Sequence, residues 1–82
     1  MVRIYQFAGC PFCYAVLARC RDLGLEAGRD YELVEASRGT PGRAEVIERG
    51  GLSQVPFLVD GDVQMYESRD IIRYLEQKFR SA

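Results

Sequence analysis

The order of strand-like and helix-like segments restricts what this chain can fold into more than any other feature of the sequence. Alternating apolar residues and clusters of β-branched or aromatic residues predict strands over residues 2–7, 31–35, 55–60 and 63–66. Apolar residues three or four positions apart predict helices over residues 11–23, 41–50 and from residue 68 onward. Two strand–helix units followed by a hairpin and a helix predict an α/β fold. We expect a four-stranded mixed sheet with three helices on its two faces, its first two strands being parallel neighbours.

Prolines, glycines and short polar side chains mark where these segments begin and end. Pro11 and Pro41 suit the first turn of a helix, and Thr40 suits an N-cap. The pair Asp60-Gly61 predicts the hairpin turn, and Ser68 predicts the cap of the last helix. The expected inward faces of the first and last helices consist of Val16, Leu17, Cys20 and Leu23, and of Ile71, Ile72, Leu75 and Phe79.

Length, composition and charge exclude several classes of protein. The 82 residues suffice for one domain, which we expect to span residues 1–82. A net charge of −1 without a run of like charges argues against a nucleic-acid partner, and the sequence has no apolar stretch of membrane-spanning length. Three cysteines without a secretion signal indicate a reducing, cytoplasmic setting. We further expect a monomer.

The sequence Cys10-Pro11-Phe12-Cys13 carries the reactive groups of the chain. Two thiols at this spacing are typical of half a metal site or of a redox dithiol. With no histidine and only one further cysteine, Cys20, a tetrahedral metal site lacks ligands, and we expect no metal. The start of a helix favours the redox interpretation, because unpaired N–H groups and the helix dipole stabilise a thiolate there. Cys20 lies on the inward helical stripe and is interpreted as a core residue.

Two further motifs complete a pattern. With Cys10-Pro11-Phe12-Cys13, the segments Gln54-Val55-Pro56 and Tyr66-Glu67-Ser68 make the chain resemble the thioredoxin superfamily, and within it the glutaredoxins. The ending Glu67-Ser68, continued by Arg69-Asp70-Ile71-Ile72, looks like the N-terminal domain of glutathione transferases, an ending that a subset of glutaredoxins shares. The resemblance covers essentially the whole chain and implies a thioredoxin-like fold of the order β-α-β-α-β-β-α.

The resemblance also implies a role for each motif. Cys10 would be the nucleophile and Cys13 the resolving thiol. Pro56 would be a cis-proline that turns the backbone of Val55 toward glutathione, which would pair with it as a short strand does. The start of the last helix would bind the γ-glutamyl carboxylate. The complete predicted glutathione site consists of Phe12, Gln54, Val55, Pro56, Glu67 and Ser68.

Each motif also has a simpler interpretation, and one family feature is absent. On their own, Pro56 fits the start of an edge strand and Ser68 a helix cap. Many glutaredoxins have a lysine or arginine three residues before the first cysteine to bind the glycine carboxylate of glutathione, whereas this chain has Phe7. Arg38, Arg49 and Gln54 remain as candidates for this contact.

The expected function is therefore that of an enzyme, a glutathione-dependent thiol–disulfide oxidoreductase. Its partners would be glutathione as co-substrate and glutathionylated or disulfide-bonded proteins. Three alternatives stay open: a carrier of a glutathione-ligated [2Fe–2S] cluster, a hydrogen donor coupled to thioredoxin reductase, and a glutathione-transferase-like module. The last needs a helical C-terminal domain for its electrophile, for which 82 residues leave no room.

Overall fold

The first strand lies inside the sheet, where it pairs with the second and the third strand. The computed structural model describes residues 1–80. Its elements are β1 (Val2–Gln6), α1 (Pro11–Asp22), β2 (Tyr31–Glu35), α2 (Pro41–Gly50), β3 (Phe57–Asp60), β4 (Val63–Met65) and α3 (Ser68–Lys78). The strand order is β2-β1-β3-β4, with β1 and β2 parallel and the other two pairs antiparallel. The predicted mixed sheet and its parallel first pair are thus confirmed.

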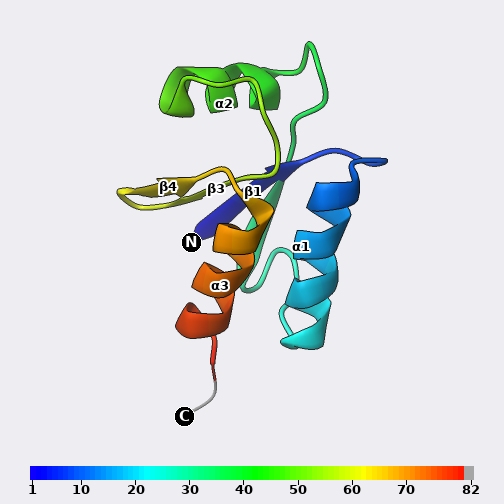
Figure 1. Ribbon diagram of the computed structural model, residues 1–82, viewed down its shortest axis with the longest axis vertical. Helices are drawn as coiled ribbons and strands as arrows, with labels where there is room; N and C mark the ends of the chain where they lie inside the picture. Colours follow the sequence, from blue (N-terminus) through cyan, green and yellow to red (C-terminus); the bar gives the residue numbers. More distant parts are fainter. Residues whose placement is uncertain (81–82) are drawn as a thin grey trace.

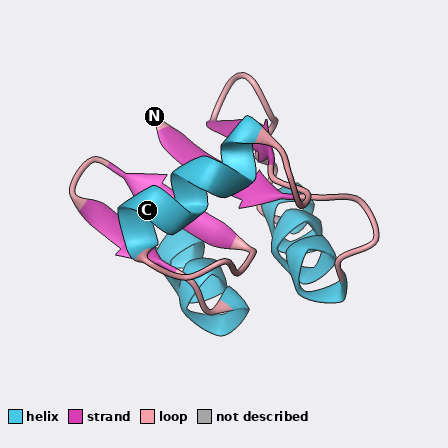
Figure 2. Cartoon of the chain, turned by 90° about the horizontal axis from the view of Figure 1, so that it is seen from above, coloured by secondary structure: helices cyan, strands magenta, loops and turns pink. Residues whose placement is uncertain are grey.

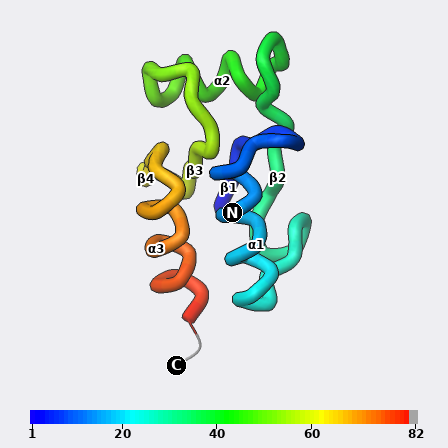
Figure 3. The backbone as a smooth tube through the Cα atoms, turned by 45° about the vertical axis from the view of Figure 1, so that its right-hand side comes forward, coloured from blue at the N-terminus to red at the C-terminus, as the bar shows by residue number. Residues whose placement is uncertain are grey.

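The helices cover the two faces of the sheet unequally. Helix α2 lies over one face, and α1 and α3 lie over the other (Figure 1). The view from above shows α2 in front of the strands and the other two helices behind them (Figure 2). Helices α1 and α3 run side by side and pack against each other (Figure 3). Within residues 1–80, no helix combines the length and the apolar character needed to cross a bilayer.

The alternating side chains of β1 supply both hydrophobic cores. Val2 and Ile4 point toward α1 and α3, where they join a buried cluster with Val16, Cys20, Tyr31, Leu58, Ile71 and Leu75. Tyr5 points toward α2, in a second cluster with Ala36, Val46, Phe57 and Val59. This division follows from the two-residue period of a strand. Cys20 is fully buried in the first cluster, as its interpretation as a core residue predicted.

Most predicted element ends are confirmed; β1, α1 and β4 end one residue earlier than predicted, and two element starts need correction. Thr40 caps α2, and its hydroxyl accepts the N–H of Arg43 at 3.2 Å. However, β3 begins at Phe57 and not at residue 55, because Pro56 has no N–H to donate to a ladder. Ser68 is the first residue of α3 and not its N-cap, because the carbonyl of Glu67 already accepts the first helical hydrogen bond, from Ile71.

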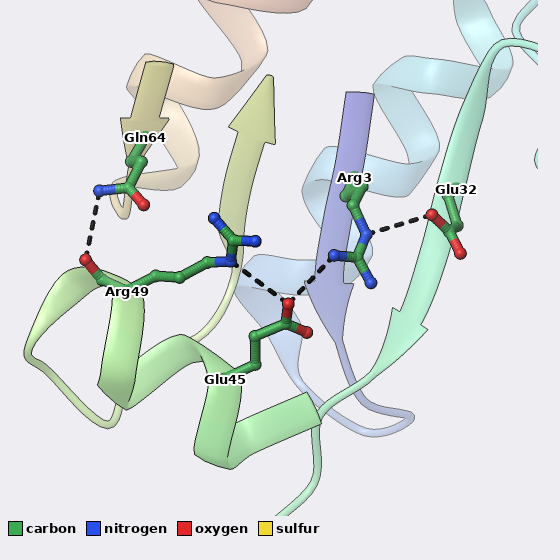
Figure 4. Close-up of polar contacts among 5 residues, drawn as sticks. All are labelled: Arg3, Glu32, Glu45, Arg49 and Gln64. Atoms are coloured by element: carbon green, nitrogen blue, oxygen red, sulfur yellow. Dashed lines mark hydrogen bonds and ion pairs between the residues drawn. The ribbon is translucent and has the colours of Figure 1, made fainter. Parts of the chain in front are cut away.

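A network of polar contacts joins α2 to the sheet (Figure 4). The Glu45 carboxylate pairs with Arg3 of β1 at 3.1 Å and with Arg49, one turn along α2, at 3.2 Å. Arg3 also pairs with Glu32 of β2 at 3.1 Å, and the Gln64 amide donates to the Arg49 carbonyl at 3.2 Å. Because exposed ion pairs contribute only about 0–1 kcal/mol each, we interpret this network as orienting α2 more than as stabilising the fold.

Candidate functional site

Cys10 occupies the N-cap position of α1, after the short loop that follows β1. The backbone N–H of Cys13 donates to the Cys10 sulfur at 3.2 Å. Pro11 fills the first helical position, where a missing N–H has no cost. The Cys10 sulfur thus accepts a backbone N–H and lies at the positive end of the helix dipole. The sequence predicted this helix-start placement, and the structure confirms it.

Cys13 lies one turn inside α1 and is protected from solvent. Its side chain is 1% exposed, compared with 8% for Cys10. Burial, and after it the adjacent Cys10 sulfur, raise the pKa of the Cys13 thiol from its ordinary value to about 12. Arg43 and the backbone of Phe7 act in the opposite direction on this pKa. Cys13 is therefore a protonated thiol at neutral pH, while Cys10 is the more accessible sulfur.

Two adjoining hollows meet at the loop between α2 and β3. The first has a volume of about 240 Å³ and is lined by Phe12, Gln54, Val55, Pro56, Tyr66, Glu67 and Ser68. The second has a volume of about 480 Å³ and is lined by Phe7, Gly9, Cys10, Pro11, Arg38, Arg43, Ser53, Gln54 and Val55. Because Gln54 and Val55 line both, we refer to the two hollows together as the groove. All six residues predicted to contact glutathione thus lie together, in the first hollow.

The wall shared by the two hollows contains the peptide bond between Val55 and Pro56. This bond is cis, as the resemblance implied. Pro56 is buried, whereas Val55 is half-buried and faces both hollows. Neither residue belongs to β3, so the backbone polar groups of Val55 are outside the sheet ladder. These groups are suitable for pairing with an extended peptide in the groove.

The start of α3 closes the far end of the first hollow. Glu67 is the N-cap residue, and its side chain makes no capping hydrogen bond to the helix. The N–H groups of the first turn therefore have no side-chain cap and can bind an anion. Ser68 is half-buried at the first helical position and lines the hollow with its side chain or backbone.

Comparison with known proteins identifies the family. Residues 4–82 match the family model described as glutathione S-transferase, N-terminal domain. The chain belongs to this family. It is 40% identical over 81 residues to glutathione S-transferase 4 of Zea mays, which covers 96% of this chain and 34% of that protein. It is 41% identical over 64 residues to glutathione S-transferase 1 of Zea mays, covering 76% of this chain and 30% of that protein.

A solved structure agrees with this assignment. The structure described as glutathione S-transferase-I bound with the ligand lactoylglutathione superposes with a TM-score of 0.76 at 27% identity, over 96% of this chain and 37% of the other. The chain thus spans about a third of the length of these relatives. The match confirms the thioredoxin-like fold and the transferase-like ending that Glu67-Ser68 indicated. These relatives are named glutathione S-transferases, whereas the sequence motifs had indicated a glutaredoxin.

In this glutathione S-transferase N-terminal domain, the second hollow is also lined by Arg43, a cation that was not among the residues predicted from the sequence. Arg43 of α2 is 8% exposed, and its guanidinium donates to the Ala36 carbonyl at 2.9 Å and to the Ser53 hydroxyl at 3.0 Å. No carboxylate of residues 1–80 pairs with it. Its guanidinium carbon lies 5.9 Å from the ring centre of Phe7, the residue that stands where many glutaredoxins have a cation.

Of the three residues that the sequence offered for the glycine carboxylate, two line the groove of this domain and one does not. Arg38 and Gln54 line the second hollow, whereas Arg49 lines neither hollow and pairs with Glu45 (Figure 4). Arg49 is therefore excluded from the groove. A signal for Arg43 was present in the sequence: a cation in the first turn of a helix opposes the helix dipole, which suggests that other contacts hold it there.

Among residues 1–80 of the domain, no three His, Cys, Asp or Glu side chains gather as metal ligands do. The third thiol, Cys20, has its pKa raised to about 11 by burial. Its side chain packs in the core under α1 and does not line the groove.

The buried thiols predict a loss of stability at alkaline pH. The pKa of Cys20 is higher in the folded than in the unfolded chain, so its stabilising effect is complete below about pH 9 and is lost as the pH rises toward 11. We expect the free energy of unfolding, measured with urea at a series of pH values, to fall over this range. The fall should be less steep for Cys20→Ala. Equal slopes for the two proteins would contradict this assignment.

Proposed function

We propose that this domain is a glutathione-dependent thiol–disulfide oxidoreductase that reduces protein–glutathione mixed disulfides. One observation carries the proposal: a sulfur at a helix start accepts a backbone N–H and lines a peptide-sized groove, with a second, protonated thiol directly behind it. A second thiol behind the first has a use in disulfide exchange, where it can resolve a mixed disulfide. We also propose that residues 1–82 act as one domain and that it works in the reducing cytoplasm, which suits its free thiols.

The groove offers a complementary group for each charged end of glutathione. The free N–H groups at the start of α3 suit the γ-glutamyl carboxylate, and the Glu67 carboxylate suits the α-amino group. The backbone of Val55 suits the central cysteine residue of glutathione. At the other end, Arg43 and Arg38 suit the glycine carboxylate. In this orientation the sulfur of glutathione would lie next to Cys10, which lines the second hollow.

The proposed reaction exchanges one sulfur–sulfur bond at a time. The Cys10 thiolate attacks the glutathione sulfur of the mixed disulfide, the sulfur–sulfur bond breaks, and the protein thiolate leaves and takes a proton from water. Cys10 is then bonded to glutathione. The thiolate of a second glutathione attacks that bond, which releases glutathione disulfide and restores the Cys10 thiolate. One free glutathione is consumed for each mixed disulfide that is reduced, and the glutathione disulfide contains that molecule and the glutathionyl group of the substrate.

The protonation state of Cys13 determines when this thiol can attack the disulfide between Cys10 and glutathione. While Cys10 is a free sulfur, it helps to keep the Cys13 thiol protonated. Once Cys10 carries glutathione, its charge is gone, whereas Arg43 still favours the Cys13 thiolate. Burial, the largest cause of the raised pKa, remains. We therefore propose that attack by a second glutathione is the main route at neutral pH and that the Cys10–Cys13 disulfide forms mainly at alkaline pH.

This order of events predicts the effect of removing the second thiol. We expect Cys13→Ser to keep the reduction of a glutathionylated peptide within about threefold of the wild type at pH 7, because glutathione itself completes the cycle. The same variant should lose the reduction of an intramolecular protein disulfide. Both activities are measured as NADPH oxidation with glutathione and glutathione reductase. Loss of the first activity together with the second would contradict the proposed main route.

The names of the relatives favour a second candidate, the transfer of glutathione to an electrophile. That reaction needs a group that stabilises the glutathione thiolate but no protein nucleophile. The decisive experiment compares two assays on the same preparation: reduction of a glutathionylated peptide and conjugation of glutathione to 1-chloro-2,4-dinitrobenzene. We expect the first activity to exceed the second. Conjugation without reductase activity would overturn the proposal.

A further inference from the structure

The hydroxyl group of Tyr66 contacts the loop that lies between the two hollows. The hydroxyl oxygen accepts the backbone N–H of Leu52 at 3.0 Å and lies 2.9 Å from the Leu52 carbonyl, to which it can donate. The Val46 carbonyl of α2 lies 3.3 Å away as a second acceptor. A single side chain thus satisfies both backbone groups of Leu52, the residue that follows the C-cap of α2.

The loop has few other contacts that could hold it in place. The Leu52 side chain is 54% exposed, and residues 51–54 are all exposed. Its two polar anchors are the Tyr66 hydroxyl on Leu52 and the Arg43 guanidinium on Ser53. Two residues further on, Val55 lines both hollows and packs against the second core cluster. The exposed residues 51–54 that lead to Val55 therefore depend on these two hydrogen-bonding side chains for their position.

Tyr66 also connects the two ends of the first hollow. It lines that hollow and is bonded directly to Glu67, which caps α3 at the other end. The tyrosine ring is held by Phe57 of the sheet, with ring centres 4.6 Å apart. At Gly50, the last residue of α2, an added Cβ would overlap the tyrosine hydroxyl. The absence of a side chain at Gly50 thus leaves room for this contact.

We propose that Tyr66 is a positioning residue whose hydroxyl sets the distance between the Val55 backbone and the start of α3. This inference rests on the proposed function, because the ligand that spans this distance is glutathione. The Tyr66 hydroxyl should therefore act on the affinity for glutathione. A groove that is ordered before glutathione binds loses less conformational entropy on binding. The hydroxyl does not line the second hollow, where Cys10 lies, so the chemical step should depend on it little.

The test begins with Tyr66→Phe, which keeps the ring against Phe57 and removes only the hydroxyl. We expect the Kd for glutathione, measured by calorimetry, to rise roughly five- to tenfold, as expected from the loss of one or two hydrogen bonds. KM for glutathione should rise in parallel, while kcat at saturating glutathione changes less than about twofold. Without glutathione, hydrogen exchange should accelerate at the Leu52 amide, which a direct contact to the ligand alone would not cause.

Two further variants serve as controls. Tyr74→Phe removes a hydroxyl that donates to Asp60 outside the groove, and we expect it to leave the Kd unchanged. Gly50→Ala keeps the Tyr66 hydroxyl but adds a methyl group that should displace it from Leu52. We expect this variant to raise the Kd for glutathione as well. If Tyr66→Phe does not fold, Gly50→Ala decides the question. The inference is overturned if either folded variant binds glutathione as the wild type does. If the wild type itself does not bind glutathione, the proposed function fails instead.

Discussion

Replacing Cys10 with serine should abolish the reduction of glutathionylated peptides, with a fall in kcat/KM of more than about 10³-fold. A serine hydroxyl stays protonated at neutral pH and cannot form the sulfur–sulfur bond of the mixed disulfide. The fold should tolerate the change, because the serine oxygen can still accept the N–H of Cys13 as an N-cap. The measurement is the NADPH-coupled assay, together with a melting temperature that shows the variant is folded.

Cys20→Ala provides the matched control for this prediction. It removes a thiol that lies in the core and outside the groove, so it should reduce stability but leave kcat/KM nearly unchanged. Mass spectrometry after brief treatment with glutathione disulfide should find glutathione on Cys10 in the wild type and no adduct in Cys10→Ser. A Cys10→Ser protein within tenfold of wild-type activity would show that the nucleophile lies elsewhere.

Replacing Arg43 with methionine should weaken glutathione binding more than any other change distant from the cysteines. Only two of its hydrogen bonds go to the protein within residues 1–80, and a guanidinium has five N–H donors. Because Arg43 lines the second hollow, we expect its remaining donors to reach a carboxylate that binds there. Hydrogen bonds to a charged group contribute about 1.5–3 kcal/mol, so we expect the Kd for glutathione to rise roughly 10- to 100-fold.

Arg49→Met is the matched control, because it makes the same substitution on the same helix. Arg49 pairs with Glu45 outside the groove, so its loss should leave the Kd unchanged. Arg43→Met should also destabilise the fold by about 1–3 kcal/mol, because the Ala36 carbonyl and the Ser53 hydroxyl lose their partner. Urea unfolding separates that effect from binding. Equal Kd values for the two variants would remove Arg43 from the glutathione site.

Local signals in the sequence were sufficient for most of the fold. The two strand–helix units, the hairpin turn at Asp60-Gly61 and the cap at Thr40 each depend on residues within a few positions of one another. The errors have the same local origin. The strand pattern continued through Val55 and Pro56 because both suit an extended backbone, although Pro56 cannot join the ladder. Ser68 suited a cap by its residue type, but the helix already begins there.

By itself, the sequence determined the reactive groups that the proposed function uses: two thiols one helical turn apart at a helix start, and the motifs that surround them. Which cations line the hollow that contains Cys10 was decided only by the tertiary structure. Arg43 and Arg49 are six residues apart, which at 3.6 residues per turn places them on well-separated faces of α2. The packing of α2 over the sheet turns one toward the groove and the other toward Glu45. Arg43 thereby lies beside Phe7, a contact between residues distant in the chain that no local pattern encodes.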